Sequence, residues 1–365
     1  MKRRIDLGLL YSRSGSYSLI SEACRTGVLG AVAEVNADPA LDLAFVPVER
    51  DPGGNIDLYG PMCDEILTQS GARHVVGCVT SWSRKEVIPT LEHRGGTLWY
   101  PVPYEGFEAC DHVVYTHACP NQHLLPLLAW TFASFGRRGY LTGSNYIWGW
   151  EMNRLAREVI SGAGGEVLGE RYIPIGATEI ARLIEEIRVT RPDFILNSLI
   201  GPSQYAFLAA IARLGQEDAH FRPETCPVLS CNLTECELPA IGGAAAEGLI
   251  AAGPYFRGAQ TGARKGNFGS SHEASAHAAV WMLASMLNGR PGAEDLPITE
   301  LLASEAGAAT GIDPKTHHTT LPALIAQVRG GAFEVVKDFG PVAADPYLAR
   351  GREVTLPTPM LRVVP

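Results

Sequence analysis

Residues 74–100, HVVGCVTSWSRKEVIPTLEHRGGTLWY, contain one complete strand–helix–strand unit. The apolar run His74–Val79 predicts a strand, Ser83–Arg94 predicts a helix, and the short apolar run Thr97–Tyr100 predicts the next strand. Strands that alternate with helices of this length pair in parallel within one sheet. The segment therefore predicts an α/β fold with a mostly parallel sheet.

The same alternation continues on both sides of this unit. The predicted strands are 5–10, 43–48, 74–79, 97–100, 113–115, 138–142, 167–173, 194–198, 228–230 and 248–252, and the predicted helices are 20–36, 55–68, 83–94, 121–135, 148–161, 178–190, 203–214 and 271–287. The C-terminal part, which includes Phe333–Val336, is interpreted as strands and loops. Two successive runs of βα units predict two doubly wound parallel-sheet lobes, with a ligand held between them.

The composition is that of a globular protein and excludes several classes of function. The chain has 365 residues, of which 46% are hydrophobic and 19% charged, and its formal net charge is −9. This length favours two domains. Acidic and basic residues are interspersed, so no basic run is available for nucleic acid. No apolar run reaches the length that spans a membrane.

The N-terminus and the cysteines indicate the compartment. Met1–Arg4 is followed at once by a predicted strand that contains Asp6, which is unlike the apolar core of an export signal. We therefore expect a cytoplasmic protein, or a periplasmic one if a signal peptide was removed from this chain. The eight cysteines form no CxxC pair, which favours buried, reduced thiols over a zinc site.

The glycine-rich segment Gly162–Gly169 does not match a dinucleotide-binding loop. Val167 stands where the last glycine of G-x-G-x-x-G is required, and the segment follows a helix and precedes a strand, which is the reverse of the usual order. Phosphate-binding P-loop and nucleophile-elbow sequences are also missing from the chain. We expect no cofactor.

Two histidine-containing patterns resemble chemical sites but lack features that such sites need. His272 and His277 lie five positions apart, so on a helix they diverge by roughly 140° and miss the spacing of zinc-binding pairs. Cys119 and His123 could form a thiol–base pair, but they have no evident third group to orient them. We expect neither a metal site nor an enzyme.

Residues 100–108, YPVPYEGFE, follow a predicted strand and concentrate two tyrosines, two prolines and two glutamates. Tyrosine combines an apolar ring with one hydroxyl group, and proline fixes the backbone without offering a donor. Such a segment suits a small rigid pocket with polar tips. A proline-rich turn whose tyrosines pack into the core would read the same, and this segment alone leaves both interpretations open.

Several segments together carry a family resemblance. In order along the chain they are 51–54 (DPGG), 76–89 (VGCVTSWSRKEVIP), 100–108, 120–122 (PNQ), 143–147 (GSNYI) and 345–347 (DPY). The chain resembles the amide- and urea-binding branch of the type I periplasmic-binding-protein fold. Within that branch it is most similar to the cytoplasmic amide sensors that negatively regulate aliphatic amidase operons. The likeness spans nearly the whole chain.

The resemblance implies two lobes joined by a three-segment hinge. The crossovers are expected near Thr116–Asn121, near Ala251–Pro254 and beyond Gly311. The N-terminal lobe would then comprise residues 1–118 and 254–312, and the C-terminal lobe residues 119–253 and 313–365. A short amide or urea would bind in the cleft between the lobes and be enclosed when they close.

The resemblance also implies which residues bind the ligand. Ser81 would contact it through its hydroxyl and backbone N–H, and Tyr100 and Tyr146 would supply hydroxyl groups. The residues implied for the pocket wall are Pro101, Tyr104, Trp148 and Asn232. Read without the family, Ser81 or Ser83 is better explained as a simple helix N-cap than as a ligand contact.

Three positions depart from the pattern of the amide sensors. Val79 stands where an aromatic hydroxyl is expected, Val102 replaces a threonine, and Trp148 replaces a smaller aromatic residue. The two valines remove hydroxyl groups and add branched apolar bulk. We expect a less polar and differently shaped pocket, which leaves the identity of the amide open.

These observations support three functional hypotheses. The first is a regulator that senses an amide by lobe closure and controls an amidase operon through a partner, which the family implies to be an RNA-binding antitermination protein. The second is the solute-binding receptor of an ABC transporter for urea or short-chain amides. The third is an amide hydrolase, for which the sequence displays no nucleophile with a base. Assembly into a homo-oligomer is left open.

Overall fold

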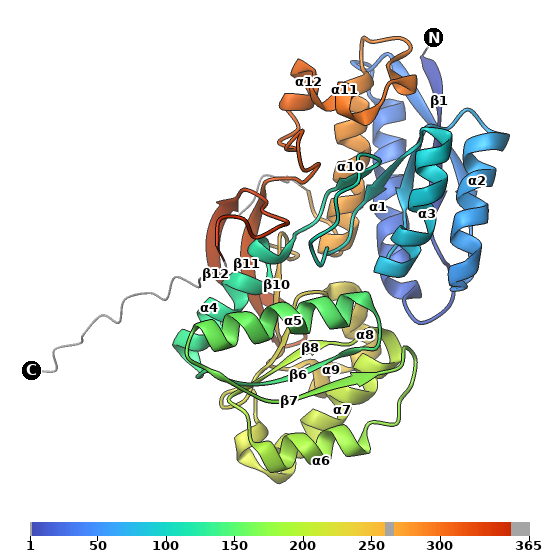
Figure 1. Ribbon diagram of the computed structural model, residues 1–365. Helices are drawn as coiled ribbons and strands as arrows, with labels where there is room; N and C mark the ends of the chain where they lie inside the picture. Colours follow the sequence, from blue (N-terminus) through green and yellow to red (C-terminus); the bar gives the residue numbers. More distant parts are fainter. Residues whose placement is uncertain (1, 260–265, 352–365) are drawn as a thin grey trace, which may run out of the picture.

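The computed structural model describes residues 2–259 and 266–351 and consists of two α/β lobes stacked one above the other (Figure 1). The N-terminal lobe is built on a five-stranded sheet whose strands are all parallel, in the order β2-β1-β3-β4-β5. Its strands are β1 (Arg3–Leu10), β2 (Leu43–Arg50), β3 (His74–Gly77), β4 (Thr97–Tyr100) and β5 (Val113–Tyr115).

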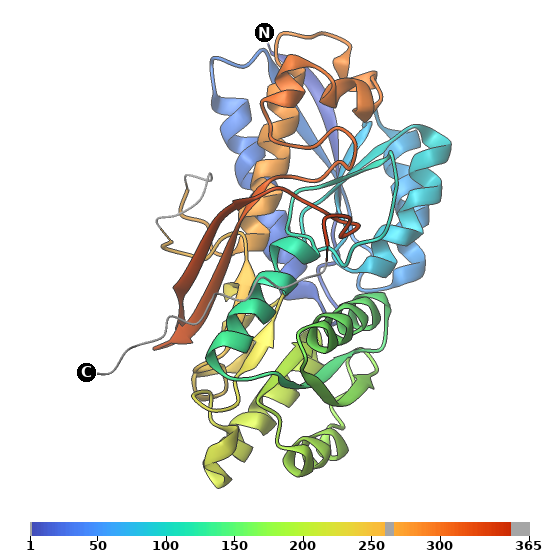
Figure 2. The ribbon, with the colours of Figure 1, turned by 60° about the vertical axis from the view of Figure 1, so that its left-hand side comes forward.

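Four main helices cover this sheet, and one of them comes from a distant part of the chain. They are α1 (Ser18–Ala37), α2 (Tyr59–Gln69), α3 (Ser81–Arg94) and α10 (Ser271–Leu287). Helix α10 lies beside α1 in both ribbon views (Figures 1 and 2). The two backbones are so close that a methyl group on Gly27 would lie 2.2 Å from the carbonyl oxygen of Glu273. Only glycine permits this approach.

The C-terminal lobe is built on a seven-stranded mixed sheet in the order β12-β11-β10-β9-β8-β6-β7. Its strands are β6 (Arg138–Ser144), β7 (Glu166–Ile173), β8 (Phe194–Ser198), β9 (Val228–Ser230), β10 (Ile250–Gly253), β11 (Leu321–Arg329) and β12 (Ala332–Val342). Strands β6 to β10 are parallel, whereas β11 and β12 form an antiparallel hairpin added at the edge. The predicted class of two parallel-sheet lobes is confirmed, and the hairpin adds an antiparallel part to the second sheet.

The helices of the C-terminal lobe lie on both sides of its sheet (Figures 1 and 2). The longer ones are α4 (Leu124–Ser134), α5 (Ile147–Gly162), α6 (Ala181–Thr190) and α7 (Gly201–Glu217), and the short ones are α8 (Leu238–Ile241) and α9 (Gly243–Ala246). Two further short helices, α11 (Ile298–Leu302) and α12 (Glu305–Ala308), follow α10 at the far end of the N-terminal lobe. None of the helices in the described ranges is both long and apolar enough to span a bilayer.

The chain passes between the two sheets after β5, after β10 and before β11. The first and third passages touch each other. The backbone N–H of Tyr115 donates to the carbonyl oxygen of His317 at 2.9 Å, and the Thr319 hydroxyl donates to the carbonyl oxygen of Tyr115 at 3.0 Å. The lobe boundaries given above stay a proposal, and residues 260–265 and 352–365, which they include, lie outside the described residues.

The turn between β3 and α3 departs from its predicted boundaries. Strand β3 ends at Gly77 because Cys78 adopts a left-handed conformation, with φ of 65°. Thr80 is the N-cap: its hydroxyl accepts a hydrogen bond from the backbone N–H of Ser83, and the Ser83 hydroxyl accepts one from the N–H of Thr80, both at 3.1 Å. This capping box starts the helix at Ser81, two residues earlier than predicted.

Candidate functional site

A small cavity lies between the two lobes. Its lining from the N-terminal lobe is Tyr17, Ile20, Val79, Thr80, Ser81, Tyr100, Val102, Pro103 and His272, and its lining from the C-terminal lobe is Tyr146, Trp148, Ile200 and Asn232. The cavity encloses about 30 Å³. Because one water needs about 10–15 Å³ on this measure, the space suits a molecule of only a few heavy atoms.

Ser81 presents the beginning of helix α3 to the cavity. Thr80 acts as the cap, so Ser81 is the first helical residue and is not needed as the N-cap. Its side chain is buried and lines the cavity, and the capping hydrogen bonds of this turn are made by Thr80 and Ser83 without the Ser81 hydroxyl. The first N–H groups of a helix also lack intrahelical partners and carry partial positive charge. This corner of the cavity can therefore hold an oxygen acceptor such as a carbonyl.

Tyr146 brings a second hydroxyl to the cavity from the opposite lobe. It is the residue that precedes α5, and its ring packs edge-on against Trp82, with the ring centres 5.4 Å apart. Burial raises the pKa of Tyr146 well above its usual range, so the hydroxyl stays protonated. No side chain or backbone group in the described ranges bonds this hydroxyl. It is therefore available to a ligand as donor or acceptor.

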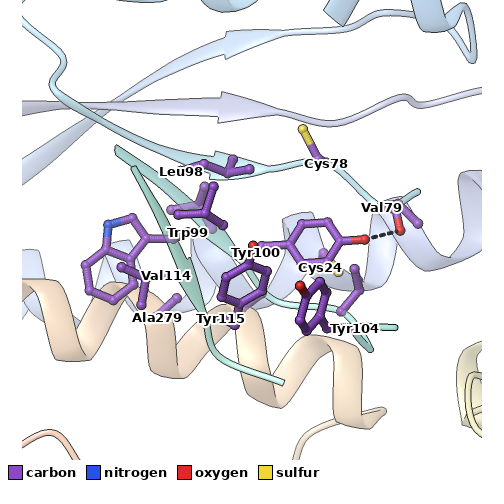
Figure 3. Packing of buried hydrophobic residues seen from close by; sticks show 14 of the residues in the cluster. Cys24, Cys78, Val79, Leu98, Trp99, Tyr100, Tyr104, Val114, Tyr115 and Ala279 are labelled. Carbon is purple, nitrogen blue, oxygen red and sulfur yellow. Dashed lines mark hydrogen bonds between the residues drawn. The ribbon is translucent and has the colours of Figure 1, made fainter. Parts of the chain in front are cut away.

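Tyr100 is already engaged with the cavity wall. Its hydroxyl donates to the carbonyl oxygen of Val79 at 3.1 Å, as Figure 3 shows. Burial raises the pKa of Tyr100, which keeps this hydrogen bond in place. The hydroxyl has only one proton, and it is donated to the Val79 carbonyl oxygen. Toward a ligand, the Tyr100 oxygen can therefore only accept a hydrogen bond. Its chief effect is to tie the end of β4 to the turn that leads into α3.

Asn232 lines the cavity, but its side-chain amide is satisfied by the protein. Its Nδ2 donates to the carbonyl oxygen of Leu199 at 3.2 Å, and its Oδ1 accepts from the hydroxyl of Ser230 at 3.0 Å. These bonds join the turns that follow β8 and β9. Asn232 therefore shapes the cavity wall and has little hydrogen-bonding capacity left for a ligand.

Of the nine residues named from the sequence, seven line the cavity: Val79, Ser81, Tyr100, Val102, Tyr146, Trp148 and Asn232. Pro101 and Tyr104 lie outside the lining, where Pro103 takes part instead. Tyr104 turns away because its ring packs against Tyr115, with the ring centres 4.4 Å apart (Figure 3). Its hydroxyl also accepts a hydrogen bond from the backbone N–H of Glu108. That the seven residues contact a ligand remains a prediction.

Glu105 and Glu108, to which the sequence assigned no role, bind a buried arginine. Arg84 on α3 is inaccessible to solvent, and its guanidinium lies 2.6 Å from the Glu105 carboxylate and 2.8 Å from that of Glu108. It also lies over the rings of Tyr100 and Tyr104, at 4.8 and 4.9 Å from their centres. This network holds segment 100–108 against α3 directly behind the cavity.

The cavity lining carries no charged side chain. Neither aspartate, glutamate, lysine nor arginine is among the lining residues that the structure describes, and the nearby Arg84 is neutralised by its two carboxylates. A charged ligand would lose its hydration there without gaining a counter-charge from a side chain. The lining suits a neutral polar molecule.

Sequence reasoning missed several lining residues: Tyr17, Ile20, Thr80, Pro103, Ile200 and His272. In the sequence, His272 stands out only through its spacing from His277. The described residues contain no group of three or more metal-ligating side chains that could hold an ion. Two of these residues could have been found from their position in the predicted elements. Tyr17 and Ile200 each lie between the carboxyl end of a strand and the start of a helix, where ligands bind in α/β folds.

Comparison with known proteins supports the fold. A family model described as a periplasmic binding protein domain matches residues 5–288. The chain is similar to an ABC-transporter solute-binding protein from R. palustris solved with 4-hydroxybenzoate, at 18% identity, 95% coverage of this chain, 100% of that chain and a TM-score of 0.77. It is also similar to the branched-chain amino acid binding protein LivJ from Streptococcus pneumoniae with isoleucine, at 17% identity, 94% and 100% coverage and a TM-score of 0.75.

Proposed function

Since the chain belongs to the periplasmic binding protein domain family, we propose that it is a solute-binding receptor that delivers a small neutral amide or urea to an ABC transporter. The receptor role is favoured over the regulator role because the similar structures named above are solute-binding proteins of ABC transporters or of amino acid transport. The observation that carries the ligand class is the small, uncharged cavity between the lobes.

The cavity argues against the ligands of those similar structures. Benzoates and amino acids carry a carboxylate, and amino acids also carry an ammonium group, whereas this lining offers no side chain of opposite charge. An aromatic ring also exceeds the space of about 30 Å³. A short amide or urea fits the chemistry better. Its carbonyl would meet the N-terminus of α3 at Ser81, and its NH₂ protons would meet hydroxyl oxygens such as that of Tyr146.

The size of such a ligand limits its affinity. A molecule of about four heavy atoms gains at most about 1.5 kcal/mol per atom, or roughly 6 kcal/mol in total, which corresponds to a Kd of tens of micromolar. The binding assay must therefore reach millimolar ligand. A ligand at about 100 times its Kd adds about 2.7 kcal/mol to the stability of the folded state.

A thermal-shift screen tests the ligand class. The panel contains acetamide, propionamide, urea and N-methylurea, with benzoate, isoleucine and acetate as charged counterparts. We expect one or more of the neutral compounds to raise the melting temperature and the charged ones to leave it unchanged. A rise with benzoate or isoleucine alone would overturn the proposed ligand class and leave the family assignment intact.

A separate measurement distinguishes the receptor from the amide-responsive regulator, which stays the second candidate because the cavity suits an amide in either role. The protein is isolated from its own cells, and its mature N-terminus and co-purifying partners are identified by mass spectrometry. A processed N-terminus and permease subunits support the receptor. An intact Met1 and an RNA-binding partner would support the regulator instead.

The hydroxyl groups of Ser81 and Tyr146 give a direct test of the site. Replacing Ser81 by alanine or Tyr146 by phenylalanine is expected to weaken amide binding by about 1–3 kcal/mol each, because a ligand polar group is left unpaired. Isothermal titration with the best compound of the screen measures the effect. Because no described residue bonds either hydroxyl, the melting temperatures should change little, and unchanged affinities in both variants would show that the site lies elsewhere.

A further inference from the structure

His272 is a buried polar side chain that lines the cavity, and the one polar group in the described ranges that shifts the pKa of its ring is the backbone of Asn232, which also lines the cavity. It lies in the first turn of α10, is 1% exposed, and forms part of the cavity wall. Neither Nδ1 nor Nε2 has the geometry of a hydrogen bond to a described residue, although the Asn232 backbone lies close enough to raise the pKa of the ring against the larger effect of burial. One ring nitrogen at most is engaged by that backbone, so at least one is left for the cavity. Buried polar groups are almost always bonded, so an unbonded one that faces a cavity indicates that something in the cavity bonds it.

The surroundings hold His272 in a fixed position. Ser271, the preceding residue, shares a hydrogen bond of 3.2 Å with Nε2 of His117, and the Thr116 hydroxyl donates to the carbonyl oxygen of Ser275 at 3.3 Å. The first turn of α10 is thereby tied to the segment by which the chain leaves the N-terminal lobe. Because the backbone on both sides of His272 is fixed, its ring is placed in advance of ligand binding, which favours affinity.

The protonation state of His272 matches the neutral cavity. Burial lowers the pKa of His272 to about 4, so at neutral pH the ring is uncharged. A neutral imidazole offers one N–H donor and one acceptor nitrogen. An amide or urea likewise presents both donors and an acceptor, so it can bond either tautomer of the ring.

We propose that His272 is a ligand-binding residue that hydrogen-bonds the neutral solute in the cavity. This inference rests on the proposed function and adds to it a contact from α10 that complements the hydroxyl groups of Ser81 and Tyr146. The solute is then held by the end of α3, by the beginning of α5 and by the first turn of α10. Specificity for compounds that carry both donor and acceptor groups follows from the two nitrogens.

Variants of His272 test this contact by isothermal titration with acetamide, propionamide and urea. His272→Leu, which keeps the bulk and removes both nitrogens, is expected to weaken binding at least tenfold. His272→Gln, which keeps a donor and an acceptor, is expected to stay within about threefold of the wild type. The matched control is His74→Leu. His74 is equally buried, its Nε2 is unpartnered, and the pKa of His74 is also lowered to about 4, but it lies on β3 away from the cavity.

The outcomes separate this inference from the proposed function. If the wild type binds none of the three compounds, the proposed ligand class fails and the inference falls with it. If the wild type binds but His272→Leu binds within twofold, only the inference fails. Should His272→Leu not fold, ring ¹⁵N spectra of the wild type decide. The His272 signals must shift on addition of the ligand while those of His74 stay unchanged, and unmoved His272 signals would overturn the contact.

Discussion

Replacing Arg84 by methionine is expected to lower the free energy of unfolding by about 3–5 kcal/mol, because the buried Glu105 carboxylate is left without its partner and Glu108 loses one of its two cationic partners. The guanidinium is inaccessible to solvent and bonds the buried carboxylate of Glu105 and the partly buried carboxylate of Glu108. Methionine fills a similar volume, so the loss of stability results from removing the charge and not from opening a cavity. Urea unfolding followed by circular dichroism measures the difference, unless urea binds the cavity, in which case guanidinium chloride replaces it.

Arg94 provides the matched control on the same helix. Its guanidinium lies 2.7 Å from the Asp64 carboxylate, but both side chains are exposed. Arg94→Met should therefore cost less than about 1 kcal/mol. Adding Glu105→Gln to the Arg84→Met variant should restore part of the loss, because the uncompensated charge is removed, whereas Glu108 keeps its ion pair with Lys85. Equal effects of Arg84→Met and Arg94→Met would show that the buried network contributes little.

The same network gives the protein a pH dependence in acid. Burial alone would raise the pKa of Glu108, but Arg84, Lys85 and Tyr115 outweigh it and lower that pKa from its ordinary value of 4.5 to about 2. A carboxyl whose pKa is depressed by folding stabilises the protein above its unfolded pKa and loses that contribution as the pH falls. Stability should decline between about pH 4.5 and pH 2, and the decline should be shallower in Arg84→Met.

Replacing Gly201 by alanine is expected to weaken ligand binding about 100-fold, or about 2.7 kcal/mol, by preventing the lobes from closing fully. Gly201 begins α7 in the C-terminal lobe, next to the cavity residue Ile200. A methyl group there would lie 1.9 Å from the carbonyl oxygen of Ser16 in the N-terminal lobe. The Ser16 carbonyl is part of the backbone and cannot rotate away from the added methyl group. The two lobes must therefore move apart to relieve the clash. Titration measures the affinity, and solution scattering measures the compaction on ligand addition.

Gly164→Ala separates closure from backbone strain. Both glycines adopt a left-handed conformation, with φ of 59° at Gly201 and 72° at Gly164, but a methyl group on Gly164 meets nothing within 4 Å. Both variants should therefore lose comparable stability, because alanine is disfavoured in this conformation. Only Gly201→Ala should lose affinity and ligand-induced compaction. If Gly201→Ala still binds and compacts like the wild type, closure of the lobes on the ligand is contradicted.

The parallel sheets could be predicted because their signals are local. Thr97–Tyr100 is a short apolar run after Gly95 and Gly96, and it became β4 with the predicted boundaries. Of the hairpin of β11 and β12, the sequence indicated only strand character around Phe333–Val336, and it gave neither the bounds of the two strands nor their antiparallel pairing. Leu321–Arg329 is mostly apolar, and it pairs antiparallel with both β10 and β12. These directions are set by the path along which the chain returns to the second lobe and not by the residues of β11 itself.

Part of the candidate site was equally accessible to sequence reasoning. Ser81 begins a helix and Tyr146 immediately precedes one, and both helices follow a strand, which is the position where α/β folds bind ligands. Arg84 and His272 gave no comparable indication. The burial of Arg84 depends on carboxylates about 20 residues away, and that of His272 depends on the return of the chain to α1 after more than half its length. Polar residues that are buried by distant segments look like surface residues in the sequence.

The close contact between α1 and α10 has a consequence for biosynthesis. The N-terminal sheet is made from the first 115 residues, yet the α1 backbone at Gly27 is covered by Glu273, which a ribosome adds about 250 residues later. At a few residues per second this leaves the apolar face of α1 uncovered for tens of seconds. The sheet of the C-terminal lobe is likewise incomplete until β11 and β12, near the end of the chain, have been synthesised. Neither lobe can therefore finish folding on the ribosome before nearly the whole chain has emerged, and the nascent protein should depend on chaperones that shield α1.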